Sequence, residues 1–258
     1  MLLTVLLPFA CLLGPALLSD RTFAMRDAAH FYYPLFEWTT QEWAAGRVPL
    51  WNPYENGGLP TVADASSSIF YPGKLLFVLP LGFALNYKLY ITLHVLLAAA
   101  GVYRLARRWQ ASESAASVAA VAYALGGNVV FQYCNVVFLV GAAWLPWALQ
   151  AADGMLVQRC WRSALGLGVV LALMILGGDP QAAFHTLLLA GAYLLFLSWR
   201  KRGAGAEARP YQSFAGRGLL LGLAASAGFL LSAVQVLPSS EAAKGSERAA
   251  YNSPRNIY

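Results

Sequence analysis

The stretch GLLLGLAASAGFLLSAVQVL (residues 218–237) contains no charged side chain. An α-helix of about 20 mainly apolar residues crosses the hydrocarbon core of a bilayer, so this stretch is long enough to span it. The whole chain has the same character, because 59% of its 258 residues are hydrophobic and only 12% are charged. Soluble domains carry about 25% charged residues. The sequence therefore predicts an all-α fold, a polytopic bundle of transmembrane helices.

The apolar runs predict about seven membrane-spanning helices, in a bundle that covers residues 1–237. The expected spans are residues 2–18, 87–105, 115–133, 136–152, 163–176, 181–199 and 218–237. The apolar piece 75–85 is too short to cross and contains Pro80 and Gly82, so we expect a re-entrant or interfacial segment there. Residues 238–258 are polar, and we expect them to form an extracytoplasmic tail that is truncated from a longer protein.

The basic residues indicate the orientation. Ten of the eighteen lysines and arginines lie in or beside the connectors that follow the second, fourth and sixth expected spans. Cytoplasmic loops of membrane proteins carry such an excess. The N-terminus is therefore expected inside, and the long loop 19–74 and the Asp179 turn outside. The same clustering accounts for the net charge of +6, so nucleic acid is not expected as a partner.

The loop 19–74 is the expected site of any chemistry, because long loops tend to be functional. It holds Asp27 and Asp64, which we expect to be catalytic, and Asp179 is expected to join them from the outer turn GGDP (177–180). Each has a plainer interpretation. Asp27 could pair with a neighbouring arginine or stay solvated, Asp64 could close an Asx-turn or cap a helix, and Asp179 before Pro180 is a good helix cap.

The remaining polar groups are assigned by position. His30 follows Asp27 by three residues and His185 follows Gln181 by four, so each pair would share a helix face. The loop tryptophans and tyrosines could stack on sugar rings or simply anchor the loop at the membrane interface. Mid-span His94 is expected to bond to a neighbour. Cysteine and histidine spacing predicts neither a disulfide framework nor a metal site.

Three segments carry a resemblance to a known family. They are RDAAHFYYPLFEW (26–38), GRVPLWNPYENGGLPTVADASSSIFYPGKLLFVLP (46–80) and ILGGDPQAAFHTLLLAGAYLLF (175–196). Together they resemble the YfhO-like family of bacterial membrane proteins, which is related to class C glycosyltransferases. The resemblance runs along the whole chain and corresponds to the N-terminal section of longer members.

The resemblance implies a membrane glycosyltransferase of the bacterial cytoplasmic membrane. The donor would be a polyprenyl-phosphate sugar, and the acceptor a component of the cell envelope. Asp27 matches the acidic residue of the first outer loop, which would take the proton of the acceptor hydroxyl. The expected substrate-binding residues are Arg26, His30, Arg47, Trp51, Asn52, Tyr54, Asp179, Gln181 and His185. The cations considered for the lipid phosphate are Arg26, Arg47, Lys74 and Lys88. A divalent cation remains an open alternative as a cofactor. The loop has no DxD or ExD pair, so the sequence does not establish that the reaction depends on a metal.

Two alternatives remain. One is a transporter or flippase of a lipid-linked substrate, although transporters bind at the membrane midplane and the acids here lie near the span ends. The other is an inactive fragment or an assembly partner in an envelope complex.

Overall fold

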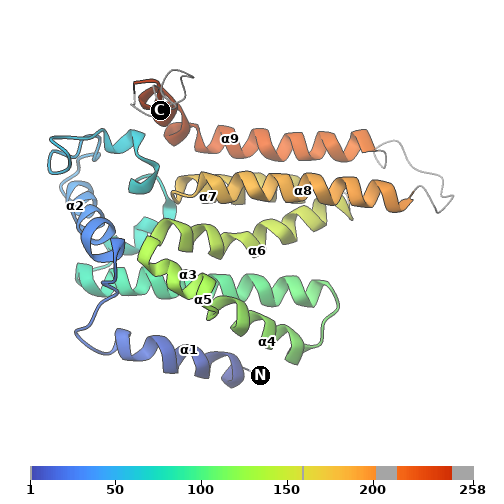
Figure 1. Ribbon diagram of the computed structural model, residues 1–258, viewed down its shortest axis with the longest axis horizontal. Helices are drawn as coiled ribbons and strands as arrows, with labels where there is room; N and C mark the ends of the chain where they lie inside the picture. The colour runs from blue at the N-terminus through green and yellow to red at the C-terminus, as the bar shows by residue number, and fades with distance from the viewer. Residues whose placement is uncertain (1, 159, 202–213, 246–258) are drawn as a thin grey trace, which may run out of the picture.

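The computed structural model describes residues 2–158, 160–201 and 214–245, and every regular element among them is a helix (Figure 1). The α-helices are α1 (Leu2–Leu17), α2 (Tyr33–Ala44), α3 (Phe83–Arg108), α4 (Glu113–Ala124), α5 (Gly127–Val130), α6 (Val136–Leu156), α7 (Trp161–Leu176), α8 (Pro180–Lys201) and α9 (Phe214–Lys244). Tighter or wider turns form η1 (Ala28–Tyr32), η2 (Thr61–Ala63), η3 (Ala65–Ser67), η4 (Pro72–Val78) and η5 (Phe131–Asn135). The fold is all-α, as predicted.

Four helical segments are long and apolar enough to cross a membrane. They are Phe83–Arg108, Gly127–Leu156, Pro180–Trp199 and Phe214–Lys244. The apolar helices Leu7–Leu17 and Trp161–Leu176 are shorter. These segments, with the composition, are those of a membrane protein, and the described residues give four such spans where the sequence predicted about seven.

The third expected span, residues 115–133, does not form one helix. Helix α4 ends at Ala124, and α5 restarts at Gly127 with Gly126 in an extended backbone conformation. Paired glycines leave the backbone free to change direction, and an apolar composition does not reveal that break. At the other end of the chain, α9 continues through Pro238 to Lys244, so the expected tail begins as helix. Residues 246–258 and the basic connector 202–213 lie outside the described residues.

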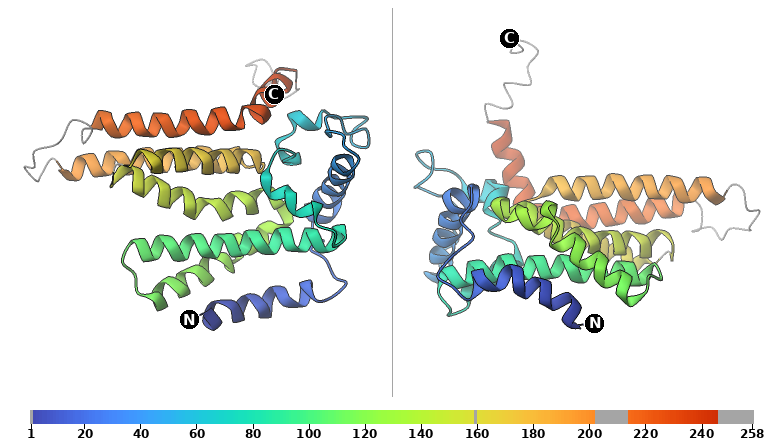
Figure 2. Two further views of the ribbon diagram at one scale, coloured as in Figure 1. Left: turned by 180° about the vertical axis from the view of Figure 1, so that it is seen from behind. Right: turned by 60° about the horizontal axis from the view of Figure 1, so that its bottom comes forward.

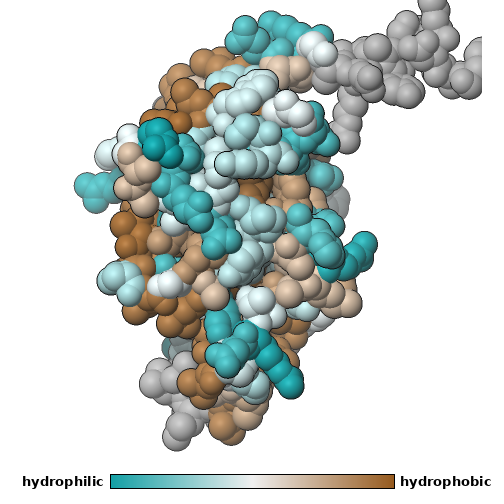
Figure 3. All heavy atoms as spheres, turned by 90° about the vertical axis from the view of Figure 1, so that its left-hand side faces the viewer, coloured by the Kyte–Doolittle hydropathy of each residue, from teal (hydrophilic) through white to brown (hydrophobic). Residues whose placement is uncertain are grey.

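The molecule has two different ends. The long loop gathers at one end, where α2 lies across the ends of the long helices, and the α7–α8 turn lies there too (Figures 1 and 2). The C-terminal ends of α3, α6 and α8 lie at the opposite end. The loop end presents a hydrophilic centre with hydrophobic residues along its flanks (Figure 3). The predicted outer acids therefore share one end of the bundle.

Small residues bring α9 close to α7. A Cβ atom added at Gly168 of α7 would lie 2.7 Å from Ala227 Cβ and 2.9 Å from the Ala224 carbonyl oxygen of α9. A Cβ added at Gly228 would lie 3.0 Å from Leu171 Cβ. Close backbone approach at small residues is how helices associate in a membrane, where lipid tails remove the hydrophobic drive. This contact fixes the helix whose far end reaches the loop.

An aromatic cluster fills the core below the loop. Phe36 of α2 and Phe77 of η4 pack edge to face with ring centroids 5.9 Å apart, and Tyr90 of α3 stacks on Phe77 at 5.2 Å. His94 is buried as expected and bonded through both ring nitrogens, Nδ1 to the Tyr90 carbonyl oxygen at 2.7 Å and Nε2 to the Tyr71 hydroxyl at 2.8 Å. These contacts attach the loop to α3.

Candidate functional site

The GGDP turn between α7 and α8 is pressed against α6. A Cβ on Gly177 would lie 3.3 Å from Val140 Cβ, and one on Gly178 would lie 2.9 Å from both Val137 Cβ and the Ala65 carbonyl oxygen. Gly178 also has φ +98°, a conformation that favours glycine. The turn therefore connects three distant parts of the chain, namely α6, the loop and α8.

Asp179 caps α8, as predicted, and also faces a cavity. Its Oδ1 accepts a hydrogen bond from the Ala182 amide at 2.9 Å. Its Oδ2 lies directly against Gly141 of α6, where any side chain would collide with it. Burial raises the pKa of Asp179, while the Ala182 amide and the nearby His185 lower it. Asp179 is thus a buried carboxyl group with one oxygen used for capping.

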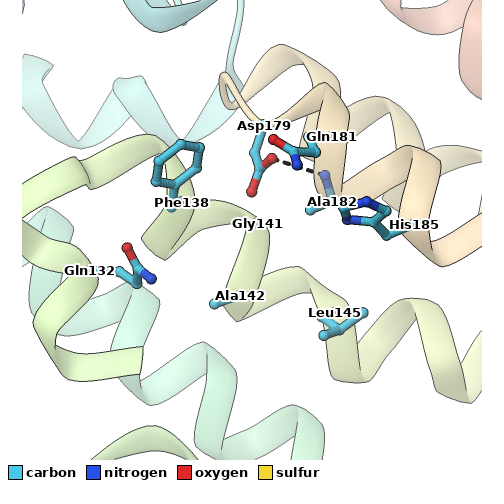
Figure 4. A pocket seen from close by; sticks show the side chains of 9 residues that line it. All are labelled: Gln132, Phe138, Gly141, Ala142, Leu145, Asp179, Gln181, Ala182 and His185. Atoms are coloured by element: carbon cyan, nitrogen blue, oxygen red, sulfur yellow. Dashed lines mark hydrogen bonds between the residues drawn. The ribbon is translucent and has the colours of Figure 1, made fainter. Parts of the chain in front are cut away.

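The cavity beside Asp179 lies between α6 and α8 and holds about 270 Å³. Figure 4 shows Asp179, Gln181 and His185 on one side, with Gln132 and Phe138 across from them. The expected neighbourhood of Gln181 and His185 beside the Asp179 turn is confirmed. Since α6 and α8 both belong to candidate spans, this cavity lies between two helices that are long and apolar enough to cross a membrane.

Asp27 lies at the surface of the same end. It directly precedes η1, and its Oδ2 accepts a hydrogen bond from Asn135 Nδ2 at 3.3 Å. The Asn135 Oδ1 in turn accepts a hydrogen bond from the Tyr32 hydroxyl at 2.6 Å. Asn135 therefore ties the exposed carboxylate to a buried tyrosine. Asp27 forms no ion pair with a described residue, so the alternative pairing with a neighbouring arginine is absent there.

Tyr32 is a residue that the charges of all three aspartates reach. Burial raises the pKa of its hydroxyl, and the charges of Asp27, Asp64 and Asp179 raise it further. The charges of all three carboxylates therefore act on the Tyr32 hydroxyl, although these carboxylates come from the residue before η1, the loop and the α7–α8 turn. We call Tyr32, Asp27, Asp64, Asp179 and Asn135 the acid cluster.

Asp64 is held both through its side chain and through the backbone before it. Its Oδ1 accepts a hydrogen bond from the Ser66 amide at 2.9 Å, so the expected capping role is present. The backbone just before it is held by α9. Gln235 Nε2 donates to the Val62 carbonyl oxygen at 2.9 Å, and Ser239 Oγ donates to that of Ala63 at 2.8 Å. A helix 173 residues further along the chain thus positions this carboxylate.

A second cavity of about 310 Å³ lies on the loop side of the acid cluster. It is lined by His30, Phe31, Pro34, Leu35, Trp38, Asn52, Tyr54 and Glu55. The structure therefore brings the predicted residues His30, Asn52 and Tyr54 together. Burial raises the pKa of Glu55, and the charge of Asp64 raises it further, while its hydrogen bond from Asn52 lowers it. The cavity is next to the acid cluster along η1, because its lining residues His30 and Phe31 directly precede Tyr32.

The predicted phosphate-binding cations are not gathered there. Lys74 donates to the Ser67 carbonyl oxygen at 3.0 Å, and its ammonium lies 3.0 Å from the Phe36 ring centroid. Lys88 is 6% exposed and donates to the Ser19 carbonyl oxygen at 2.8 Å. Arg47 is exposed and pairs with Glu42 at 2.7 Å. Lys74 and Lys88, two of the four candidate cations, are thus each bound to a backbone carbonyl, and neither lines either cavity.

Arg26 and Trp51 lie at the edge of the site. Arg26 is exposed, with φ +57°, directly before Asp27. Trp51 is 57% exposed, and its ring covers Gly58, where an added Cβ would lie 2.5 Å from Trp51 Cζ2. One face of this indole therefore shapes the hairpin that carries Asn52, Tyr54 and Glu55.

Sequence reasoning missed several residues of the site. Tyr32, Asn135, Gln132, Trp38 and Glu55 were not among the expected site residues. Trp38 and Glu55 lie in the quoted family segments and could have been found there. Asn135 gave no signal, because its partner Tyr32 is 103 residues away.

Neither a metal-binding group in the described part of the chain nor a known relative identifies the site. Among the described residues, no group of three or more histidines, cysteines and acids could hold a metal ion. No family model, curated protein or solved structure matches the chain.

Proposed function

We propose that this chain is a membrane glycosyltransferase that moves a sugar from a polyprenyl-phosphate donor to a cell-envelope acceptor outside the bacterial cytoplasmic membrane. The observation that carries the proposal is the position of the acid cluster. Its Asp179 lines the cavity between two candidate spans, and the residues just before its Tyr32 line the aromatic cavity of the loop. A lipid-linked donor would reach the first from the bilayer. The resemblance to the YfhO-like family supports the same activity.

The chemistry requires a base beside two substrates. The acceptor hydroxyl oxygen attacks the anomeric carbon of the sugar, and the bond from that carbon to the phosphate oxygen breaks. The hydroxyl proton passes to a carboxylate, and polyprenyl phosphate leaves. Asp27 suits the base, because its carboxylate is accessible and Asn135 orients it. Asp64 is the second proposed catalytic acid, since two hydrogen bonds from α9 fix the backbone just before it. Asp179, Gln181 and His185 would hold the donor side.

The test is transfer of labelled sugar in membranes that contain the full chain. Polyprenyl-phosphate mannose and polyprenyl-phosphate glucose are offered as donors, and Asp27→Asn is compared with the wild-type chain. Removing a general base slows a reaction about 10²- to 10⁴-fold. Asp20→Asn is the matched control, because Asp20 is an exposed acid of the same loop. Equal transfer by both variants and the wild-type chain would overturn the assignment of Asp27. No transfer by the inserted wild-type chain with either donor would count against the function itself.

A further inference from the structure

The loop-side cavity has the size and shape of a small-ligand site. Ligand cavities usually start near 300 Å³, and this one holds about 310 Å³. Its walls come from three neighbouring elements: η1 supplies His30 and Phe31, α2 supplies Trp38, and the hairpin that follows supplies Asn52 and Glu55. The volume suits one sugar ring rather than a polymer.

The polar groups of the cavity are fixed before any ligand arrives. Asn52 is 7% exposed, and its backbone exchanges two hydrogen bonds with Leu59, at 2.8 and 2.9 Å. Its side-chain Oδ1 accepts from the Tyr54 amide at 3.0 Å, and its Nδ2 donates to Glu55 Oε2 at 3.3 Å. The carboxylate of Glu55 is therefore held at one oxygen, and Oε1 accepts no hydrogen bond from a described residue. Such preorganisation lowers the cost of binding.

The chemistry of the lining selects a neutral, hydroxyl-rich ring. A pyranose has an apolar C–H face and a rim of hydroxyl groups. Trp38 and Phe31 offer aromatic surface to the face, while Glu55 and Asn52 offer an acceptor and an amide to the rim. The lining contains no lysine or arginine, and the Glu55 carboxylate repels anions. A phosphate or another anion is therefore disfavoured there.

We propose that the cavity formed by Trp38, Asn52 and Glu55 binds one neutral hexopyranose ring of the sugar-bearing substrate. Glu55 accepts hydrogen bonds from two ring hydroxyls, and the indole of Trp38 covers the apolar face. The placement deepens the proposed function and rests on it, because the ring would lie beside η1, the element that ends in Tyr32 and follows Asp27. The ring belongs either to the donor or to the acceptor.

Binding can be measured without any transfer. The purified full chain in lipid nanodiscs is titrated with methyl α-D-mannopyranoside and methyl β-D-glucopyranoside, and saturation-transfer NMR reports ligand protons that contact the protein. We expect at least one glycoside to bind the wild-type chain through one ring face. Glu55→Gln and Trp38→Leu should each raise the Kd for that glycoside about tenfold or more. Inorganic phosphate, titrated as a competitor, is expected to have no effect.

Matched controls separate a site from a folding defect. Glu37→Gln changes another half-buried acid, in α2, that does not line the cavity, and Trp43→Leu changes another tryptophan of that helix. Both are expected to bind like the wild-type chain, and thermal unfolding checks that all variants fold. The proposal is overturned if neither glycoside binds, or if Glu55→Gln and Glu37→Gln bind equally well.

The transfer assay then assigns the ring. If the ring belongs to the donor, Glu55→Gln raises the KM for polyprenyl-phosphate sugar, and if it belongs to the acceptor, it raises the KM for the acceptor instead. Glycoside binding without any transfer would refute the proposed function and leave the sugar site standing. Transfer without glycoside binding, and with unchanged KM values in Glu55→Gln, would refute the sugar site alone.

Discussion

Replacing Gly141 by alanine tests whether α6 and the Asp179 turn fit together as described. The new Cβ would lie 2.8 Å from Asp179 Cγ and closer still to Oδ2. The Asp179 side chain cannot move away freely, because it is held by its hydrogen bond from the Ala182 amide and by the neighbouring Pro180. The substitution must therefore displace the carboxylate or separate α6 from α8.

The magnitude follows from the two ways of relieving the clash. Losing the helix cap costs about 1 kcal/mol, and overpacking a core costs about 1–3 kcal/mol. Alanine regains up to about 1 kcal/mol of helix propensity over glycine. We therefore expect Gly141→Ala to lower the free energy of unfolding by about 1–3 kcal/mol. Gly191→Ala in α8, where an added Cβ meets no atom within 4 Å, is expected to be neutral or slightly stabilising.

The assay is equilibrium unfolding in mixed micelles with increasing SDS, followed by circular dichroism. A double-mutant cycle with Asp179→Ala isolates the contact, because that variant removes the carboxyl group that clashes. The cost of Gly141→Ala should fall by about 1 kcal/mol or more in the Asp179→Ala background. The reasoning is refuted if Gly141→Ala behaves like Gly191→Ala, or if its cost is the same in both backgrounds.

Three further predictions concern groups outside the two cavities described above. Burial lowers the pKa of Lys74 in the folded chain well below 10.5, its value when unfolded. At a pH between these two pKa values only the unfolded chain binds the proton, so the free energy of unfolding should rise with pH. Lys74→Met should flatten the corresponding rise of the thermal midpoint with pH. Equal pH slopes would contradict the buried position of the ammonium. Ser239→Ala should lower the free energy of unfolding by about 1 kcal/mol and speed amide hydrogen exchange at residues 63–67, because it removes the bond to the Ala63 carbonyl oxygen. Ser240→Ala should change neither, because its hydroxyl bonds only within α9. Similar exchange in both variants would show that Ser239 does not hold the Asp64 segment. Asp153→Asn should lower the free energy of unfolding in SDS by about 1–3 kcal/mol, because Asp153 pairs with Arg108 at 2.5 Å. The pair is only partly buried, with side-chain exposures of 11% for Asp153 and 22% for Arg108. An unchanged free energy of unfolding would show that the pair contributes nothing to stability.

The helices were largely predictable, because apolar length alone identifies them. Asp179 and Pro180 marked the start of α8 through their capping chemistry, and the structure confirms that boundary. The break at Gly126 was missed, since hydropathy averages over a glycine pair as if the helix continued. The predicted last span ended too early, at residue 237, because the residues after it are polar, although helix α9 continues to Lys244.

The site was predictable in its residue types and only partly in its geometry. The sequence named Asp27, Asp64 and Asp179, and their charges do reach a common residue. It could not name Tyr32 as that residue, because the contact depends on how η1 meets η5. Lys74 shows the opposite limit. A charged side chain is expected at a surface, and only the arrangement of Phe36 and Ser67 reveals that the ammonium is enclosed.

The clamp from α9 onto the Asp64 segment has a consequence for the order of assembly. Ribosomes deliver the loop long before α9, and until α9 docks on α7 the Val62 and Ala63 carbonyls lack their partners. The Asp64 segment would then stay unanchored while the earlier helices are already in the bilayer. We expect nascent chains that are stalled before residue 214 to expose the Asp64 segment to proteases, and chains released after residue 245 to protect it.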